Sequence, residues 1–239
     1  MSRAVAPGST PSVPQVALVG LFVTALVTAQ VTASKLLAFS LPTDLPLVGA
    51  SLVLPGAALA YALTFFASDC YAELYGRRAA TVVVNVGFVM NLVLLLLVWS
   101  TIEAPAVDPS TPGQVDLVAF ESVLGASTSI VAGSLAAYVV SQNWDVFVFH
   151  AVRNATAGQH LWLRNLASTA TSQLLDTAIF VGVAFVALGS LSPSDAVALA
   201  AGQYLFKLGV AVLDTPVVYG VVALVRSQGS GEEATAWAR

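Results

Sequence analysis

The sequence has few of the residues with which soluble enzymes and metalloproteins work. Of its 239 residues only 9% are charged, one is a cysteine and two are histidines. The single thiol, Cys70, excludes an intrachain disulfide framework and a multi-thiolate metal site. His150 and His160 lie too far apart along the chain to suggest a pair of metal ligands. We therefore expect no metal, no cofactor and no nucleic-acid partner.

What the chain has instead is apolar surface. Hydrophobic residues make up 57% of it. Its 9% of charged residues compare with roughly 25% in soluble domains, so a soluble fold is excluded. The hydrophobic runs predict an all-α polytopic membrane protein whose six spans each reach the ~20 residues that cross a bilayer. The expected spans are 15–38, 52–74, 79–99, 120–141, 165–188 and 196–225. They form one transmembrane domain, 15–226, between a disordered cytoplasmic leader, 1–14, and a flexible cytoplasmic tail, 227–239.

The loops predict how the chain is oriented. In a six-span threading all the arginines fall on one side: Arg3, Arg77, Arg78, Arg153, Arg164, Arg226 and Arg239. The opposite loops carry acidic residues, so the positive-inside rule predicts that both termini lie in the cytoplasm. We expect a multi-pass protein of the plasma membrane. The aromatic-rich connector 142–164 predicts a short interfacial helix on the cytoplasmic face.

One polar stripe lies inside the expected fifth span. At 100° per residue its members share one face of the helix: Asn165, Ser168, Thr169, Ser172, Gln173 and Asp176. A carboxylate within a bilayer is costly, so it should face the bundle interior and mark a site or pathway. We expect this stripe to form one wall of a binding site.

Other spans carry stripes of their own, each with a structural alternative. The first has Thr24, Thr28, Thr32 and Lys35, although threonines often bond to their own helix and a lysine can snorkel. The second has Asp69 and Glu73, which could instead pair with arginines at the interface. The fourth has Ser127, Ser134, Tyr138, Ser141 and Asp145, with Gln142 beside them. The sixth has Gln203, Lys207 and Asp214, and Lys207 could form a purely structural pair with Asp176.

Together these stripes predict a central polar cavity. Its carboxylates, amides, hydroxyls and aromatic rings suit a small, planar, hydrogen-bonding ligand better than an ion alone. Trp162 or Tyr138 could stack on such a ligand.

Four segments, in order along the chain, resemble the queuosine precursor transporter family, also described as VUT or YhhQ-like. They are the segment from Pro55 through Asp69-Cys70-Tyr71-Ala72-Glu73-Leu74-Tyr75-Gly76, then Ser134-Leu135-Ala136-Ala137-Tyr138 with Gln142 and Asp145, then residues 161–177, and finally Lys207 through Pro216 with Tyr219. The resemblance implies a bundle similar to the substrate-binding subunits of vitamin transporters. It also implies import of a queuosine or archaeosine precursor, 7-cyano-7-deazaguanine or a related 7-deazaguanine base, salvaged for tRNA modification.

From both lines we expect a non-enzymatic transporter with a nucleobase-like substrate. The expected substrate-binding residues are Asp69, Glu73, Gln142, Asp145, Asn165, Ser168, Gln173, Asp176 and Lys207. The alternative is the substrate-binding subunit of a multi-component, ATP-energised uptake system. Protein partners are thus left open between a homo-oligomer and an energising module. A membrane-embedded enzyme is disfavoured, because the chain has no His-Glu-x-x-His or Gly-x-Ser-x-Gly motif.

Overall fold

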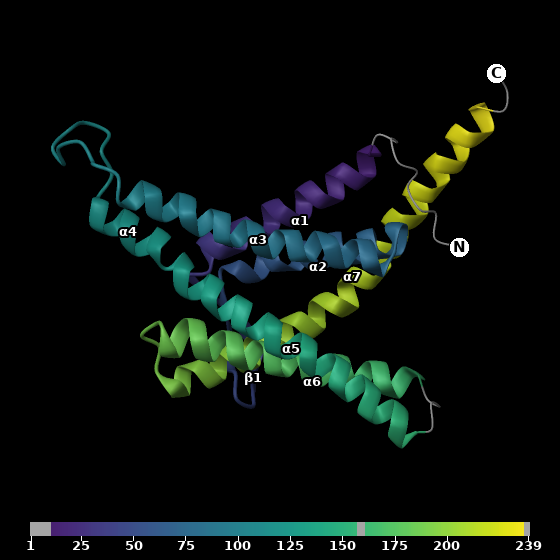
Figure 1. The fold of residues 1–239 in the computed structure, drawn as a ribbon. Helices are drawn as coiled ribbons and strands as arrows, with labels where there is room; N and C mark the ends of the chain where they lie inside the picture. Colours follow the sequence, from purple (N-terminus) through teal and green to yellow (C-terminus); the bar gives the residue numbers. More distant parts are fainter. Residues whose placement is uncertain (1–10, 157–160, 237–239) are drawn as a thin grey trace.

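The computed structural model is mostly helical, with seven α-helices, one π-helical segment and one β-hairpin among the described residues (Figure 1). It describes the backbone of residues 11–156 and 161–236, and the side chains of residues 11–156 and 167–227. Residues 1–10 of the expected leader and 237–239 of the expected tail lie outside the described residues. The division into leader, transmembrane domain and tail therefore stays a prediction.

The helices are α1 (Val13–Thr32), α2 (Ala57–Tyr75), α3 (Arg77–Ile102), α4 (Leu117–Gly125), α5 (Ser127–Ala155), α6 (Leu161–Val181) and α7 (Pro193–Ala236), and α6 runs on into the π-helix η1 (Gly182–Ala187). Local chemistry sets several boundaries. The carboxylate of Asp116 accepts a hydrogen bond from the backbone N–H of Ala119 at 2.9 Å and caps α4. Gly76 separates α2 from α3 with φ at +92°, a left-handed conformation that favours glycine.

Five helical segments within the described residues are long and apolar enough to cross a membrane. They are Val13–Thr32, Arg77–Ile102, Leu117–Ala155, Ala167–Ala187 and Pro193–Ser227. These confirm a polytopic helical protein. The remaining expected span, α2, is not among them, because Asp69 and Glu73 make it more polar. It nevertheless packs against α1, α3 and α7, and a sixth span through α2 stays a prediction.

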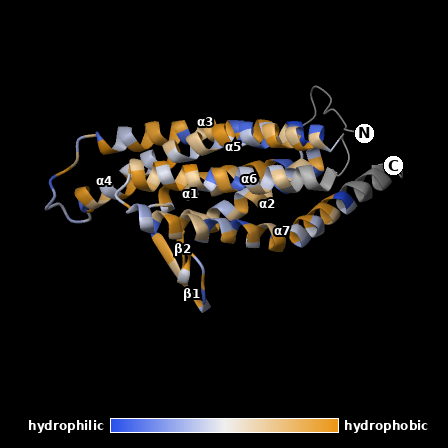
Figure 2. Ribbon diagram, turned by 90° about the horizontal axis from the view of Figure 1, so that it is seen from below, coloured by the Kyte–Doolittle hydropathy of each residue, from blue (hydrophilic) through white to orange (hydrophobic). Residues whose placement is uncertain are grey.

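Two expectations for the connections are wrong. The chain between α1 and α2 is not helical: β1 (Leu36–Leu45) pairs antiparallel with β2 (Gly49–Pro55), and this hairpin projects from the side of the bundle (Figure 2). The fold is therefore not strictly all-α. In addition, the expected interfacial helix does not form within the described part of 142–164, because α5 continues without a break to Ala155.

We call the two ends of the bundle the terminal end and the loop end. At the terminal end α1 begins, α2 turns into α3, α5 leads to α6, and α7 leaves the bundle. At the loop end lie the base of the hairpin, the connection 103–116 and the turn 188–192. Toward the terminal end, α5 and α6 run side by side and diverge from α1, α2 and α3 (Figure 1).

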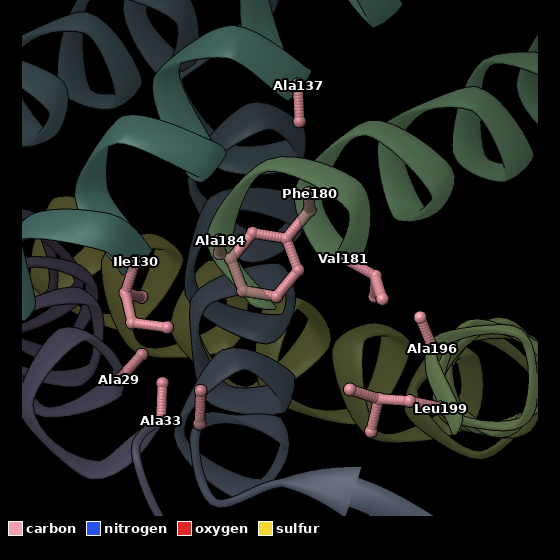
Figure 3. Close-up of a cluster of buried hydrophobic side chains, with 10 residues drawn as sticks. Ala29, Ala33, Ile130, Ala137, Phe180, Val181, Ala184, Ala196 and Leu199 are labelled. Atoms are coloured by element: carbon pink, nitrogen blue, oxygen red, sulfur yellow. The ribbon is translucent and has the colours of Figure 1, made fainter. Parts of the chain in front are cut away.

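A cluster of apolar residues, most of them alanines, joins α5 and α6 to α1, α2 and α7 at the loop end (Figure 3). Its buried members are Ala29, Ala33, Ala57, Ile130, Ala137, Phe180, Val181, Ala184, Ala196 and Leu199. Lipid is as apolar as these side chains, so close van der Waals packing, for which small residues are suited, provides the attraction. The two other clusters contain residues of α1, α2, α3 and α7 but none described from α5 or α6. We therefore call the loop end closed, because the cluster there is the only described one that joins α5 and α6 to the other helices.

Large apolar side chains are exposed along α3 and α7, including Val82, Leu96, Leu97, Val212 and Leu213. Hydrophobic residues, in orange, recur along both helices in Figure 2. On a soluble protein a surface of this kind would promote aggregation. On a membrane protein it is the surface that contacts the hydrocarbon chains.

Gly133 provides a test of the loop-end packing. A Cβ built on Gly133 would lie 2.8 Å from the Cβ of Ala184 and 3.1 Å from the carbonyl oxygen of Phe180. Gly133→Ala should therefore lower the melting temperature in detergent, since overpacking costs about 1–3 kcal/mol. Gly209→Ala is the matched control, because nothing lies within 4 Å of its new Cβ, and it should leave stability unchanged or slightly raised. Equal effects of the two substitutions would contradict this packing.

Candidate functional site

A cavity of about 180 Å³ lies between α1, α2, α3, α5, α6 and α7. Its polar lining residues are Gln30, Tyr61, Thr64, Ser68, Ser134, Tyr138, Ser141, Gln142, Gln173, Asp176, Gln203 and Lys207. Its other aromatic lining residues are Phe22, Phe65, Phe88, Phe180 and Phe206. Flat apolar rings with a few fixed polar groups are typical of small-molecule sites.

Among the described residues that line the cavity, the only charged ones are Asp176 and Lys207, and they form an ion pair. The Nζ of Lys207 lies 2.7 Å from Oδ2 of Asp176 and also donates to Oγ1 of Thr177 at 3.1 Å. The hydroxyl of Ser141 donates to the second carboxylate oxygen, Oδ1, at 3.4 Å. The side chains of Lys207 and Asp176 are 11% and 26% exposed. The ion pair is therefore largely removed from solvent and joins α6 to α7.

Helix α5 supplies the wall opposite α2 and α3. The ring of Tyr138 packs against that of Phe88, with centroids 4.0 Å apart, and its hydroxyl donates to Oδ1 of Asn85 at 3.0 Å. Tyr138 therefore lines the cavity, as expected for a stacking residue, with its hydroxyl held by α3. Trp162, the other stacking candidate, lies outside the described side chains.

The lining residues lie at different depths between the two ends of the bundle. Gln30 lies close to the end of α1 at the loop end, next to Ala29 of the packed cluster. At a rise of about 1.5 Å per residue, Asp176 and Lys207 lie further toward the middle of their helices, and Gln142 lies beyond them toward the terminal end. Gln142 is also exposed. We call the part of the cavity next to Gln30 its floor, and the part next to the exposed Gln142, on the side of the terminal end, its mouth.

Four of the expected site residues line this cavity: Gln142, Gln173, Asp176 and Lys207. Two others belong to the contact between α5 and α6. Asp145 accepts a hydrogen bond from Ser172 at 3.2 Å, and Ser168 is 2% exposed. These two residues position the wall and do not line the cavity.

Asp69 and Glu73 do not line the cavity either. Both are exposed on α2 toward the terminal end. The carboxylate of Glu73 lies 3.9 Å from the guanidinium of Arg226, which also donates to the backbone carbonyl of Glu73 at 2.9 Å. The sequence offered pairing with Arg77, Arg78 or Arg164 as the alternative, whereas the partner of Glu73 is Arg226 of α7. Asn165 lies outside the described side chains.

The expected inward stripe of α1 is wrong. Thr24, Thr28, Thr32 and Lys35 are all exposed. Thr32 donates to the backbone carbonyl of Thr28 at 2.8 Å, so its hydroxyl is satisfied by its own helix.

The polar residue that α1 does direct inward is Gln30, which the sequence reasoning did not single out. It is 1% exposed and lines the cavity. The signal that could have identified it is a lone amide within an apolar run, which is costly in a bilayer unless something binds it. Gln203 of α7 was recognised as part of a stripe but was not assigned to the site.

Two comparisons with known proteins bear on this arrangement. Residues 55–221 match the family described as "Putative vitamin uptake transporter". The chain is 33% identical to the "Probable queuosine precursor transporter" of Bacillus subtilis (strain 168) over 167 residues. These aligned residues make up 69% of this chain and 70% of that protein. Both names are those of transporters. No solved structure matches the chain.

A double-mutant cycle tests the central ion pair. Asp176→Asn and Lys207→Met should each lower the melting temperature in detergent, because each leaves one partner charged and unpaired. The double variant should lose less than the sum of the two, with a coupling of about 0.5–3 kcal/mol. Strict additivity of the two effects would show that the pair contributes no interaction energy.

Proposed function

The chain belongs to the vitamin uptake transporter family, and from this membership we propose that it imports a queuosine precursor, a 7-deazaguanine base such as 7-cyano-7-deazaguanine. The observation that carries the proposal is the chemistry of the cavity: amides and one ion pair among aromatic rings. A deazaguanine offers a flat face for those rings and an edge of N–H donors and a carbonyl acceptor for the amides. The named relative from Bacillus subtilis supports the same substrate class.

We assign the direction of transport from the distribution of charge. The described arginines at the terminal end are Arg77, Arg78, Arg153 and Arg226, whereas Asp44, Glu103, Asp108, Asp116 and Asp195 lie in the hairpin, in the loop-end connections and at the start of α7. The positive-inside rule then places the terminal end in the cytoplasm. The floor of the cavity faces outward and its mouth faces inward, so this conformation is the one that releases substrate into the cell. Transport requires a second conformation that opens the loop end.

Within the cavity we assign Asp176 and Lys207 to the middle of the path. The carboxylate of Asp176 is the lining group best able to accept N–H donors from the base, because carboxylates are stronger acceptors than amides. Lys207 holds that carboxylate in place. Gln142 and Gln173 lie nearer the mouth, where a ligand leaving the cavity would pass them.

Uptake measurements in cells test this assignment. Cells that cannot make the base and express the wild-type chain should accumulate supplied 7-cyano-7-deazaguanine. The Asp176→Asn variant should lower uptake at least about tenfold, since a hydrogen bond to a charged group contributes roughly 1.5–3 kcal/mol. The control is Asp44→Asn in the exposed hairpin, which should transport normally. Full uptake by Asp176→Asn at equal expression would remove Asp176 from the site.

Purified protein in liposomes decides between a self-sufficient transporter and a binding subunit that needs an energising module. We expect labelled 7-cyano-7-deazaguanine to enter proteoliposomes that contain this chain alone. Binding of the base without entry into the liposomes would support the multi-component alternative. Absence of both binding and entry would reject the proposed substrate.

A further inference from the structure

Gln30 is the most costly polar group at the floor of the cavity. Its side chain is 1% exposed, and neither Nε2 nor Oε1 has a hydrogen-bond partner among the described residues. A buried amide without partners loses its hydration and gains nothing in return. Gln203 approaches the same cavity from α7, and its Oε1 is likewise buried without a partner.

Several other polar lining residues already have partners within the protein. Asp176 and Lys207 neutralise each other. The hydroxyls of Thr64 and Ser68 donate to carbonyls of their own helix, and that of Tyr138 donates to Asn85. Among the described lining residues, the buried side-chain polar atoms without a hydrogen-bond partner belong to Gln30 and Gln203, and both are uncharged amides.

An amide presents one donor group and one acceptor side by side. It binds best to a ligand edge on which an acceptor and a donor are also adjacent, as in the C=O and N–H of a lactam ring. An anionic or cationic group at this place would meet no compensating charge near the floor, and burying it there would be costly. The aromatic rings of Tyr61 and Phe180 line the same part of the cavity and suit a flat ligand.

We infer that Gln30 and Gln203 are specificity-determining residues that bind the uncharged lactam edge of a planar heteroaromatic base at the closed end of the cavity. This inference rests on the proposed function. It names the edge of the base that lies at the loop end of the cavity and the two amides that recognise this edge.

The test compares two buried amides that differ only in their relation to the cavity. Asn91 of α3 is 0% exposed, both atoms of its amide are also unpartnered, and it does not line the cavity. Gln30→Met and Asn91→Leu keep approximately the size of the side chain and remove the amide. Both variants should melt at a higher temperature than the wild type without ligand, because each loses an unsatisfied buried group.

Only Gln30→Met should lose affinity for the base. By titration calorimetry in detergent, 7-cyano-7-deazaguanine should bind Gln30→Met on the order of 10–100-fold more weakly than wild type, and Asn91→Leu should bind it with the wild-type Kd. Gln203→Met provides the same comparison from α7 if Gln30→Met does not fold, and it should also weaken binding.

The outcomes separate this inference from the proposed function. A wild-type chain that binds the base, together with Gln30→Met and Gln203→Met variants of unchanged Kd, would overturn the role of the amides and leave the substrate intact. A wild-type chain that does not bind the base would reject the substrate itself. A lower melting temperature of unliganded Gln30→Met, with unchanged Kd, would show that Gln30 is a structural residue.

Discussion

The ion pair between Asp176 and Lys207 governs the electrostatics of the whole cavity. A single buried charge on either helix would be too costly to keep, but the pair allows both charges to lie within the bundle. It also makes the interior neutral overall, so an uncharged ligand enters without leaving a charge uncompensated. Because α6 and α7 each contribute one partner, any movement that separates these helices must first replace this contact.

The polar wall of α6 could be predicted from sequence, and so could the partnership of Asp176 with Lys207, because a carboxylate and an ammonium group inside apolar runs need each other. The role of α1 could not. Its threonines recur with helical spacing, yet a threonine can satisfy its hydroxyl on its own backbone and face lipid. The buried amide of Gln30 has no partner in its own helix. This single residue therefore indicates the inward face of α1 better than the row of threonines does.

The hairpin and the length of α5 were missed for a different reason. The apolar residues at the two ends of the hairpin, 36–38 and 52–55, look like continuations of α1 and α2, and composition alone does not separate a short strand from a helix end. The aromatic and charged residues after Gln142 suggested an interfacial segment, but α5 packs along α6 over this stretch and remains helical. Asp69 and Glu73 are exposed toward the terminal end, and Glu73 lies beside Arg226, which offsets part of the cost of its charge.

The π-helical segment η1 has a consequence for how this chain tolerates changes in length. It follows the turns of α6 that carry Asp176, and it contains Ala184, which lies against Gly133 of α5. Each residue turns an α-helix by about 100°. When Ala184 is held against Gly133, the number of residues between Asp176 and Ala184 therefore fixes the direction in which Asp176 points. Loss of one residue here would leave the composition of α6 almost unchanged and rotate its carboxylate away from Lys207. The geometry of the proposed site therefore depends on the spacing between Asp176 and Ala184 as well as on which residues line the cavity.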